Sequence, residues 1–314
     1  MHDQSFRSDV FLVGQYFLDL IFAGLSEVPR LGHEIYSRGF HMLPGGIANA
    51  AIALHRLGLD LVWPVQFGND LFSQTVKAEA LREGINGDHF SDIAQASIRI
   101  TAAFSTQNER GFLSYTDPLP IYAYSDLIRE TKPQWIYVSH LLCGEQFQDL
   151  ITSGRSVHAK IFMDCQAHHH TIDEDEIRKA LRQVDIFSLN RAEAAVLTSK
   201  SQIKDMLQAL SSFAPVVVIK DGANGSYLRK GSKVIHAPAE KVDVVDTTGA
   251  GDNFDCGFLF GRIKGYSWKE SLQIGNICGS YSVQGYGGSS TSPTEHQLLK
   301  TLQKNLNNHE KNIS

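Results

Sequence analysis

Asp246-Thr-Thr-Gly-Ala-Gly-Asp252 is the stretch of this 314-residue chain that indicates its fold most strongly. The two valines before it predict the end of a buried strand, and the apolar residues 253–261 after it predict a helix. The stretch therefore joins a strand to a helix N-terminus, where free backbone N–H groups and the helix dipole favour an anion. Gly249, Ala250 and Gly251 would let that anion approach the backbone, because they carry little or no side chain.

Asp252 closes this stretch and lies in the first turn of the predicted helix. From there its carboxylate can take the proton of a hydroxyl that attacks a bound phosphoryl group. We expect the helix N-terminus to keep Asp252 ionised. An anion-binding turn followed by a base predicts phosphoryl transfer, although a Gly-Ala-Gly turn alone is also a common tight connection.

A second pair of glycines opens another predicted helix. The residues are Gly45-Gly46-Ile47-Ala48-Asn49-Ala50-Ala51, and Gly58 and Gly68 follow after six and nine further residues. The paired glycines would let the backbone approach a polyol, and Asn49 can both donate hydrogen bonds to hydroxyls and accept them. By itself this pattern would suit a glycine-rich turn before a capped helix equally well.

Together the two stretches resemble the N- and C-terminal signatures of the ribokinase-like (PfkB-type) carbohydrate kinases. Three weaker matches follow predicted strands in the order of that family, so the resemblance spans about residues 9 to 295. They are Gly14-Gln-Tyr-Phe-Leu-Asp19, Asn190-Arg-Ala-Glu193 and Lys220-Asp-Gly-Ala-Asn-Gly225. The resemblance implies an α/β fold with a central, mostly parallel sheet, helices on both of its faces, and a small β-sheet lid.

The resemblance also implies a role for each matched residue. Asp252 would be the general base, and Gly249, Ala250 and Gly251 would form the anion hole. The sugar would be bound by Asp19, Gly45, Gly46 and Asn49. ATP and its magnesium would be bound by Asn190, Glu193, Lys220, Gly222, Gly225, Thr247 and Asn276, with Glu193 reaching the metal through water. Asp246 and the loop 285–291 would hold a monovalent cation such as potassium.

These roles predict an ATP- and magnesium-dependent kinase of a small carbohydrate. A pentose, a ketohexose or a 2-keto-3-deoxy sugar acid would be phosphorylated at a hydroxyl, which we expect to be a terminal hydroxymethyl. A nucleoside kinase of the same family is the nearest alternative, because Tyr16, Phe17 and Phe112 can pack against a base. A non-catalytic protein that binds sugar or nucleotide is a further alternative, but the intact Asp252 argues against it.

The chain departs from the family pattern at two positions of interest. Ile47 stands where the family has a small residue, and this predicts a tighter or more apolar sugar pocket. Cys256 also replaces a small residue, and we expect it to alter packing only. The cysteines at 143, 165, 256 and 278 are widely spaced, which favours reduced and mostly buried thiols. Consecutive histidines at 168–170 favour a loop over a metal site, because neighbouring side chains diverge.

Short β-branched runs alternate with helical patterns along most of the chain, which is typical of βαβ units. The predicted strands are Val10–Val13, Leu61–Val65, Trp135–Val138, Ile161–Asp164, Ile186–Leu189 and Val216–Ile219. The predicted helices include residues 50–57 and 73–83, and one that Thr171 and Glu174 would open as a capping box and that would run to about Val184.

Two segments interrupt this alternation and predict the lid. His33–Met42 and Ser97–Tyr115 alternate apolar and polar residues, with a hairpin turn expected at 108–111. By resemblance they would close over the sugar and provide an interface for a homodimer. Static edge hairpins are the alternative.

The composition is that of an ordinary globular protein, with 42% hydrophobic and 20% charged residues. We expect one kinase domain over residues 1–314. A net charge of -5 and a pI near 6.2 argue against a nucleic-acid partner, which would require a basic face. The sequence shows no signal peptide and no stretch near the roughly 18 apolar residues of a membrane span, so we expect a cytoplasmic protein.

Overall fold

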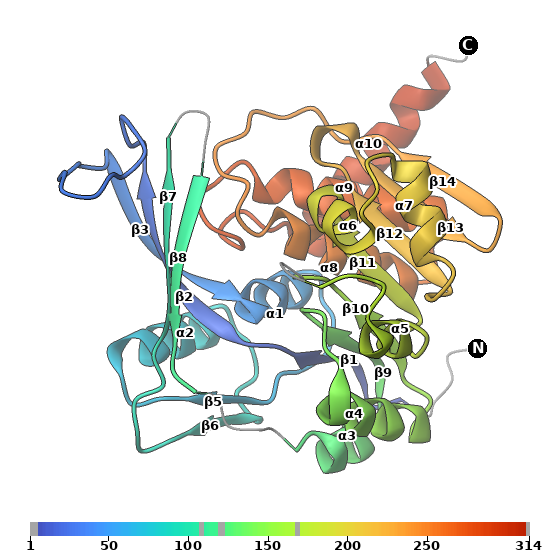
Figure 1. Ribbon diagram of the computed structural model, residues 1–314, viewed down its shortest axis with the longest axis horizontal. Coiled ribbons are helices and arrows are strands. Elements are labelled where there is room, and N and C mark those ends of the chain that lie inside the picture. Colours follow the sequence, from blue (N-terminus) through green and yellow to red (C-terminus); the bar gives the residue numbers. More distant parts are fainter. Residues whose placement is uncertain (1–5, 107–109, 119–122, 167–169, 312–314) are drawn as a thin grey trace.

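The computed structural model describes residues 6–106, 110–118, 123–166 and 170–311, and their main element is an eight-stranded sheet (Figure 1). Its order is β14-β13-β12-β11-β10-β9-β1-β4. The strands are β1 (Ser8–Val13), β4 (Leu61–Val62), β9 (Pro133–Val138), β10 (Lys160–Met163), β11 (Ile186–Asn190), β12 (Val216–Lys220), β13 (Ser226–Lys230) and β14 (Lys233–Ala237). The neighbouring strands β4, β1, β9, β10, β11 and β12 pair in parallel. The β13–β14 hairpin adds an antiparallel edge next to β12.

Helices cover both faces of this sheet, so the strands are apolar on both sides. Successive residues of β12 enter different cores: Val218 packs in one, and Val217 and Ile219 pack in the other. The first core is closed by α1 (Ile47–Arg56), α8 (Ala250–Ile263), α9 (Trp268–Ser282) and α10 (Glu295–Lys311). The second is closed by α3 (Ser125–Thr131), α4 (Gly144–Ser156), α5 (Asp175–Leu181), α6 (Arg191–Thr198) and α7 (Ile203–Leu210). This arrangement confirms the predicted fold class.

The predicted strands of the main sheet are confirmed to within a residue or two, except at Leu61–Val65. That run divides into β4 and β5 (Val65–Phe67), and β5 pairs with β6 (Phe90–Asp92) in a separate small sheet. Pro64 lies between them and has no N–H to donate to a ladder. The β13–β14 hairpin was not predicted.

The strand predicted at Val244 and Val245 is wrong. Both valines lie outside any strand, with exposed fractions of 61% and 49%. The backbone N–H groups of Val245 and Asp246 both donate to the carbonyl of Val283, just after α9. A helix end therefore holds this segment in place of a strand ladder.

The lid is a four-stranded sheet beside the main sheet, in the order β3-β2-β7-β8 (Figure 1). Its strands are β2 (Tyr16–Ala23), β3 (Gly39–Gly46), β7 (Arg99–Ser105) and β8 (Arg110–Thr116). Strand β3 leads directly into α1, and α2 (Leu71–Arg82) packs beneath the sheet. The lid strands expected within 33–42 and 97–115 are confirmed in part, since residues 33–38 form no strand. The turn expected at 108–111 lies largely outside the described residues.

Two smaller predictions, on helix α5 and on the cysteines, have clear outcomes. Helix α5 is shorter than expected, because its N-cap is Glu174, although the Glu174 carboxylate does accept a hydrogen bond from Thr171 N–H at 2.7 Å. All four cysteines are free, and all but Cys143 are buried, as predicted. Of the three histidines, His168 and His169 lie outside the described residues, and His170 Nδ1 is 3.0 Å from Glu174 Oε2. No helix in the described part of the chain is long and apolar enough to cross a membrane.

Candidate active site

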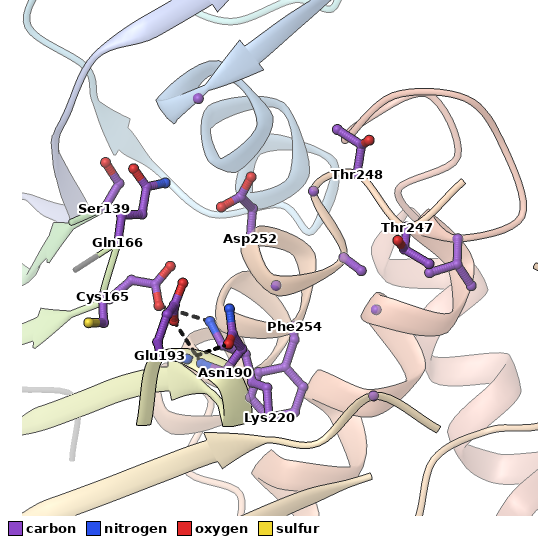
Figure 2. Close-up of a pocket in the computed structure, with 18 of the residues that line it drawn as sticks. Ser139, Cys165, Gln166, Asn190, Glu193, Lys220, Thr247, Thr248, Asp252 and Phe254 are labelled. Carbon is purple, nitrogen blue, oxygen red and sulfur yellow. Dashed lines mark hydrogen bonds and ion pairs between the residues drawn. The ribbon is translucent and has the colours of Figure 1, made fainter. Parts of the chain in front are cut away.

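A cavity of about 1360 Å³ lies between the lid and the carboxyl ends of the main strands. In folds with parallel sheets, ligands bind at this edge. Figure 2 shows Asp252 in its middle, with Ser139 and Gln166 on one side and Thr247 and Thr248 on the other. Among the predicted site residues, those lining the cavity are Asp19, Gly46, Asn190, Glu193, Lys220, Gly222, Gly225, Thr247, Gly249, Ala250, Gly251, Asp252 and Asn276. The fold therefore brings motifs that lie far apart in the sequence together around one cavity.

The predicted anion-binding turn opens α8. Gly249 is its N-cap, with a left-handed φ of 66°, and a Cβ there would lie 2.2 Å from the Cα of Gly288. Only glycine fits both constraints. Because the helix begins at Ala250, the N–H groups of Gly251 and Asp252 have no carbonyl of their own helix to bond. They are available to an anion in the cavity.

Asp252 is enclosed by neighbouring residues, yet part of its side chain faces the cavity. Burial and the nearby Asp164 raise its pKa to about 6, while a hydrogen bond from Asn49 and the charge of Lys220 act in the opposite direction. Asn49 Nδ2 donates to Asp252 Oδ2 at 3.1 Å. The carboxyl of Asp252 therefore ionises below neutral pH, and the part that the helix end plays in keeping it ionised stays a prediction.

Lys220 lies beneath the anion-binding turn. Its Nζ donates to Asp164 Oδ1 at 2.8 Å and to Asp255 Oδ2 at 2.7 Å, and it would be 3.4 Å from a Cβ on Gly251. Ser188 Oγ donates to the other oxygen of Asp255, which is fully buried. Burial alone would lower the pKa of Lys220, but the two carboxylates raise it above its ordinary value. The ammonium is therefore charged and fixed in position.

Asp164 and Asp255 are site residues that the sequence did not reveal. Asp164 follows β10 directly, and Asp255 is one turn beyond Asp252 in an otherwise apolar helix. An isolated carboxylate in such a helix is a usable signal, because a buried charge requires a partner. The partner of Asp255 is Lys220, which lies far away in the sequence, so the sequence alone did not reveal the pair.

Asn190 and Glu193 form a capping box at the start of α6. Asn190 Oδ1 accepts from Glu193 N–H at 2.9 Å, and Glu193 Oε2 accepts from Asn190 N–H at 2.8 Å (Figure 2). Burial and the charge of Asp164 raise the pKa of Glu193 to about 7, although Lys220 lowers it. The predicted Asn-x-x-Glu motif is thus a compact local unit whose glutamate faces the cavity.

The carboxylates around Lys220 outnumber the cation between them, which favours a bound divalent ion. Asp164, Glu193 and Asp252 all line the cavity, and they offer the oxygen ligands that magnesium prefers. No group of three or more His, Cys, Asp or Glu in the described segments is arranged as a ready metal cluster. Magnesium usually keeps several of its waters, so this arrangement fits a hydrated ion held at one or two carboxylates.

The other side of Asp252 holds the predicted sugar residues. Asp19 lies inside β2, where a loop position was expected, and burial, followed by the charges of Asp252 and Asp246, raises its pKa to about 7. A Cβ on Gly45 would lie 2.3 Å from the Asp19 carboxylate. Asn49 Oδ1 is buried and has no hydrogen-bond partner among the described residues. Unlike Asp19 and Gly46, Gly45 and Asn49 are not among the residues that line the cavity.

Two expectations about the walls of this pocket are wrong. Ile47 is only 1% exposed and packs in the core beneath the site, so it does not tighten the sugar pocket. Tyr16 is also buried, with its ring 5.0 Å from that of Phe67, so it is unavailable to a base. Phe17 and Phe112 do line the cavity.

The predicted nucleotide residues lie on the far side of the turn. Gly225 has a φ of 90°, and a Cβ there would be 2.1 Å from the carbonyl oxygen of Ala237. Asn276 Nδ2 donates to the carbonyls of Ala237 and Pro238, both at 3.0 Å, so its amide fixes the segment after β14 against α9. Val244 and its neighbours continue this wall.

Asp246 joins two loops next to the turn. Its Oδ1 accepts from Thr248 N–H at 3.0 Å and from Thr248 Oγ1 at 2.8 Å, and its Oδ2 accepts from Gly287 N–H at 3.0 Å. The carboxylate therefore holds the loop 285–291 against the start of α8. The monovalent-cation site at Asp246 and this loop stays a prediction.

Comparison with known proteins agrees with this geometry. Residues 8–295 match the family model of the pfkB family carbohydrate kinases. The ribokinase of Bacillus subtilis is 22% identical over 299 residues, covering 94% of this chain and 99% of that protein. The 2-dehydro-3-deoxygluconokinase of the same organism is 25% identical over 321 residues, covering 92% and 93%.

Solved structures share the fold. The ribokinase of Arabidopsis thaliana, in complex with ribose and ATP, has a TM-score of 0.78 at 21% identity and covers 94% of this chain and 98% of that one. A putative ribokinase II from E. coli with ATP and Mg²⁺ has a TM-score of 0.78 at 19% identity, with 95% and 99% covered. A nucleoside kinase from Methanocaldococcus jannaschii has a TM-score of 0.73 at 18% identity, with 95% and 99% covered. With its match over residues 8–295, this chain belongs to the pfkB family of carbohydrate kinases, which are phosphotransferases that act on alcohol groups.

Proposed function

We propose that this chain transfers the γ-phosphoryl group of ATP to a hydroxyl of a small carbohydrate, with Asp252 as the general base. The observation that carries this proposal is the position of Asp252, between the anion-binding turn and the polar pocket around Asp19 and Asn49. A carboxyl with a pKa of about 6 is ionised at neutral pH and is basic enough to accept a proton during attack.

The residues around the base would orient the acceptor. Asp19 accepts hydrogen bonds from its hydroxyls, and the unpartnered Asn49 Oδ1 accepts another. Gly45 and Gly46 let the backbone approach it closely. Holding the attacking hydroxyl beside Asp252 converts a bimolecular encounter into a positioned one, which can supply several kcal/mol of the barrier.

The turn would stabilise the group in transfer. The N–H groups of Gly251 and Asp252 face the charge that develops on its oxygens, and the fixed ammonium of Lys220 adds a positive charge below them. Gly222, Gly225, Thr247 and Asn276 would form walls of the ATP site.

Asn190 and Glu193 would hold magnesium. The negative charge of Asp164 is close enough to raise the pKa of Glu193, and it would strengthen the preference of this site for a cation. When bound, the metal would neutralise charge on the ATP phosphates. We also propose potassium at Asp246 and the loop 285–291, where the carboxylate already orders the backbone. Its test would be an activity series in potassium, sodium and choline salts.

Two finer points stay predictions. A homodimer through the lid is supported by apolar side chains on the face turned away from the cavity, where Phe22, Phe40, Met42 and Leu113 are all at least 37% exposed. A cytoplasmic location rests on the sequence alone. A nucleoside kinase remains the second candidate function, because Phe17 and Phe112 line the cavity and can pack against a base.

The direct test replaces the base. Asp252→Asn keeps the size of the side chain but removes its basicity, so kcat should fall by at least about 10²-fold with little change in ATP affinity. Consumption of ATP is measured with a panel of pentoses, hexoses, sugar acids and nucleosides. Asp126→Asn, an exposed site on α3, is the matched control and should keep full activity.

Turnover retained by Asp252→Asn on the best acceptor would remove Asp252 from its role. Wild-type protein that binds ATP and an acceptor but consumes no ATP with any of them would favour the non-catalytic alternative.

A further inference from the structure

We infer that the acceptor is electrically neutral, an unsubstituted sugar, a polyol or the ribose of a nucleoside, and not a sugar acid or a sugar phosphate. This inference rests on the proposed function and narrows its substrate class. It follows from the distribution of charge on the acceptor side of the cavity. That side is defined by the cavity-lining residues of the lid and of the segments after β9 and β10, namely Phe17, Asp19, Thr101, Phe112, Ser114, Ser139 and Gln166.

The titratable groups that face this side are carboxyls, which carry no positive charge in either protonation state. Asp19 projects from β2, and Asp252 faces it from the first turn of α8. The two carboxylates are close enough that Asp252 contributes to the raised pKa of Asp19, after burial. A carboxylate or phosphate on the acceptor would add another negative charge to this pair.

The lysines that line the cavity do not place a free positive charge beside Asp19 and Asp252. Among the described lining residues there is no arginine, and the lysines are Lys220 and Lys241. Lys220 Nζ is bonded to both Asp164 and Asp255, so that cluster is itself negative. Lys241 belongs to the segment after β14, on the nucleotide side.

Two histidines line the cavity in the described part of the chain, His140 and His170, and neither is placed as a free cation toward the acceptor side. Burial lowers the pKa of His140, which favours its neutral form. His170 is paired with the carboxylate of Glu174, with 3.0 Å between Nδ1 and Oε2. An anionic acceptor would therefore be bound without a counter-charge, in a site where desolvation makes such charges costly.

A neutral polyol, in contrast, matches the groups present. The Asp19 and Asp252 carboxylates accept hydrogen bonds from hydroxyls, and Ser114, Ser139 and Gln166 can donate as well as accept. Phe17 and Phe112 offer apolar surface to the C–H face of a ring or to a base. The same site can thus hold a sugar alone or the ribose of a nucleoside. It discriminates between acceptors by their charge.

The test compares acceptors that differ in charge. Ribose, fructose and adenosine are the neutral set, and 2-keto-3-deoxygluconate and fructose 6-phosphate are the anionic set. Turnover is followed by ADP release, and binding to wild-type protein without ATP is followed by calorimetry. We expect kcat/KM of the best neutral acceptor to exceed that of either anion by about 100-fold, and Kd to follow the same order. An anion that equals or exceeds the best neutral acceptor in both readouts overturns the inference.

The two readouts separate this inference from the proposed function. Tight binding of a neutral acceptor without ATP consumption would contradict the kinase proposal and leave the neutral site supported. Efficient phosphorylation of an anion would support the kinase proposal and contradict the neutral site. If neither the neutral nor the anionic acceptors bound, the inference of a neutral acceptor site would also be contradicted.

A designed cation gives an independent measurement. Gln166→Arg places a guanidinium on the acceptor side and should shift the ratio of anionic to neutral kcat/KM toward the anions by about 5- to 10-fold. Gln208→Arg, on the exposed face of α7, is the matched control and should leave the ratio unchanged. An equal shift in both variants, or in neither, would contradict the placement of the acceptor beside Gln166.

Salt provides a test that needs no variant. Screening weakens repulsion between charges, so raising the ionic strength from 0.05 to 0.5 M should lower Kd for the anionic acceptors and leave the neutral ones nearly unchanged. Anionic binding that weakens with salt would reveal a cationic subsite and overturn the inference.

Discussion

Asp252 is held between opposing influences, and their balance sets its use as a base. Burial and Asp164 raise its pKa, whereas Asn49 and Lys220 favour its charged form. The outcome, a pKa of about 6, is high enough for useful basicity and low enough for ionisation at neutral pH. The amide of Asn49 contacts the base through Nδ2, while its buried Oδ1 has no hydrogen-bond partner among the described residues.

The contribution of Asn49 can be measured from the pH dependence. A hydrogen bond to the ionised carboxylate lowers its pKa, so Asn49→Ala should raise the pKa of Asp252. Since the base must be ionised, activity is lost as pH falls through that pKa. The acid limb of kcat/KM, which reports the free enzyme, should lie near pH 6 in the wild type and move to higher pH, by up to about one unit, in the variant.

Asn86→Ala, on an exposed loop after α2, serves as the control and should reproduce the wild-type profile. A limb that stays in place in Asn49→Ala, even if KM rises, would show that Asn49 binds the acceptor without tuning the base.

Single residues also show where sequence patterns stop being informative. The glycines of the turn could be predicted, because a left-handed N-cap and a close backbone approach leave few other choices. The Lys220–Asp164–Asp255 cluster could not, because its members meet only after β10, β12 and α8 are assembled. Ile47 was misassigned for the same reason: its position in the motif does not say which way its side chain points.

At the scale of elements, the main strands were predictable and the lid only partly so. Buried parallel strands are continuous apolar runs with clear ends. Strand β2 follows β1 after only Gly14 and Gln15, so the two strands read as one apolar run followed by a polar loop. Between β1 and β2 the chain leaves the main sheet and enters the lid sheet. No local sequence pattern indicates that the two strands belong to different sheets.

The lid contacts the loop 285–291 through residues of β3. His41 on β3 stacks on Tyr286 with ring centroids 4.4 Å apart, and Leu43 is close to Gly287. Phe17, Thr101 and Phe112 face the cavity from the lid strands. An acceptor bound among them would connect the lid to the main sheet.

We therefore predict that the acceptor orders the lid. Hydrogen exchange of the backbone amides of β3, β7 and β8 should slow when the best neutral acceptor is present at saturation, because closure buries them and excludes water from the reacting groups. The β13–β14 hairpin is the internal control, since it is an edge of the main sheet and lies on the nucleotide side. Equal protection of the lid with and without acceptor would leave it as a static sheet or a permanent interface.

At the scale of the whole molecule, the order of the motifs along the chain was the strongest predictor. The Asn190–Glu193 and Lys220–Gly225 motifs start at the last residue of β11 and of β12, and a parallel sheet brings the carboxyl ends of its strands to one edge. The Asp246–Asp252 motif reaches the same edge without a strand before it. What that order does not contain is the balance of charge inside the cavity. Asp19, Glu193 and Asp252 all have raised pKa values, because the fold buries them together before any ligand arrives.

This concentration of carboxylates should make the ligand-free protein less stable at neutral pH than in mild acid. The pKa of Asp19 in the folded protein, about 7, exceeds the ordinary value of 3.8 for an aspartate, so the folded state binds more protons than the unfolded state between those pH values. The free energy of unfolding must then decrease as pH rises through that window. Asp19→Asn mimics the protonated form, so it should stabilise the protein by about 1–3 kcal/mol at pH 7.5 and have little effect at pH 4. Thermal unfolding across this range, with the exposed Asp126→Asn as control, measures the difference. If Asp19→Asn unfolded at the wild-type temperature at pH 7.5, the ligand-free site would already have a counter-charge for Asp19, and the neutral-acceptor inference would lose part of its physical basis.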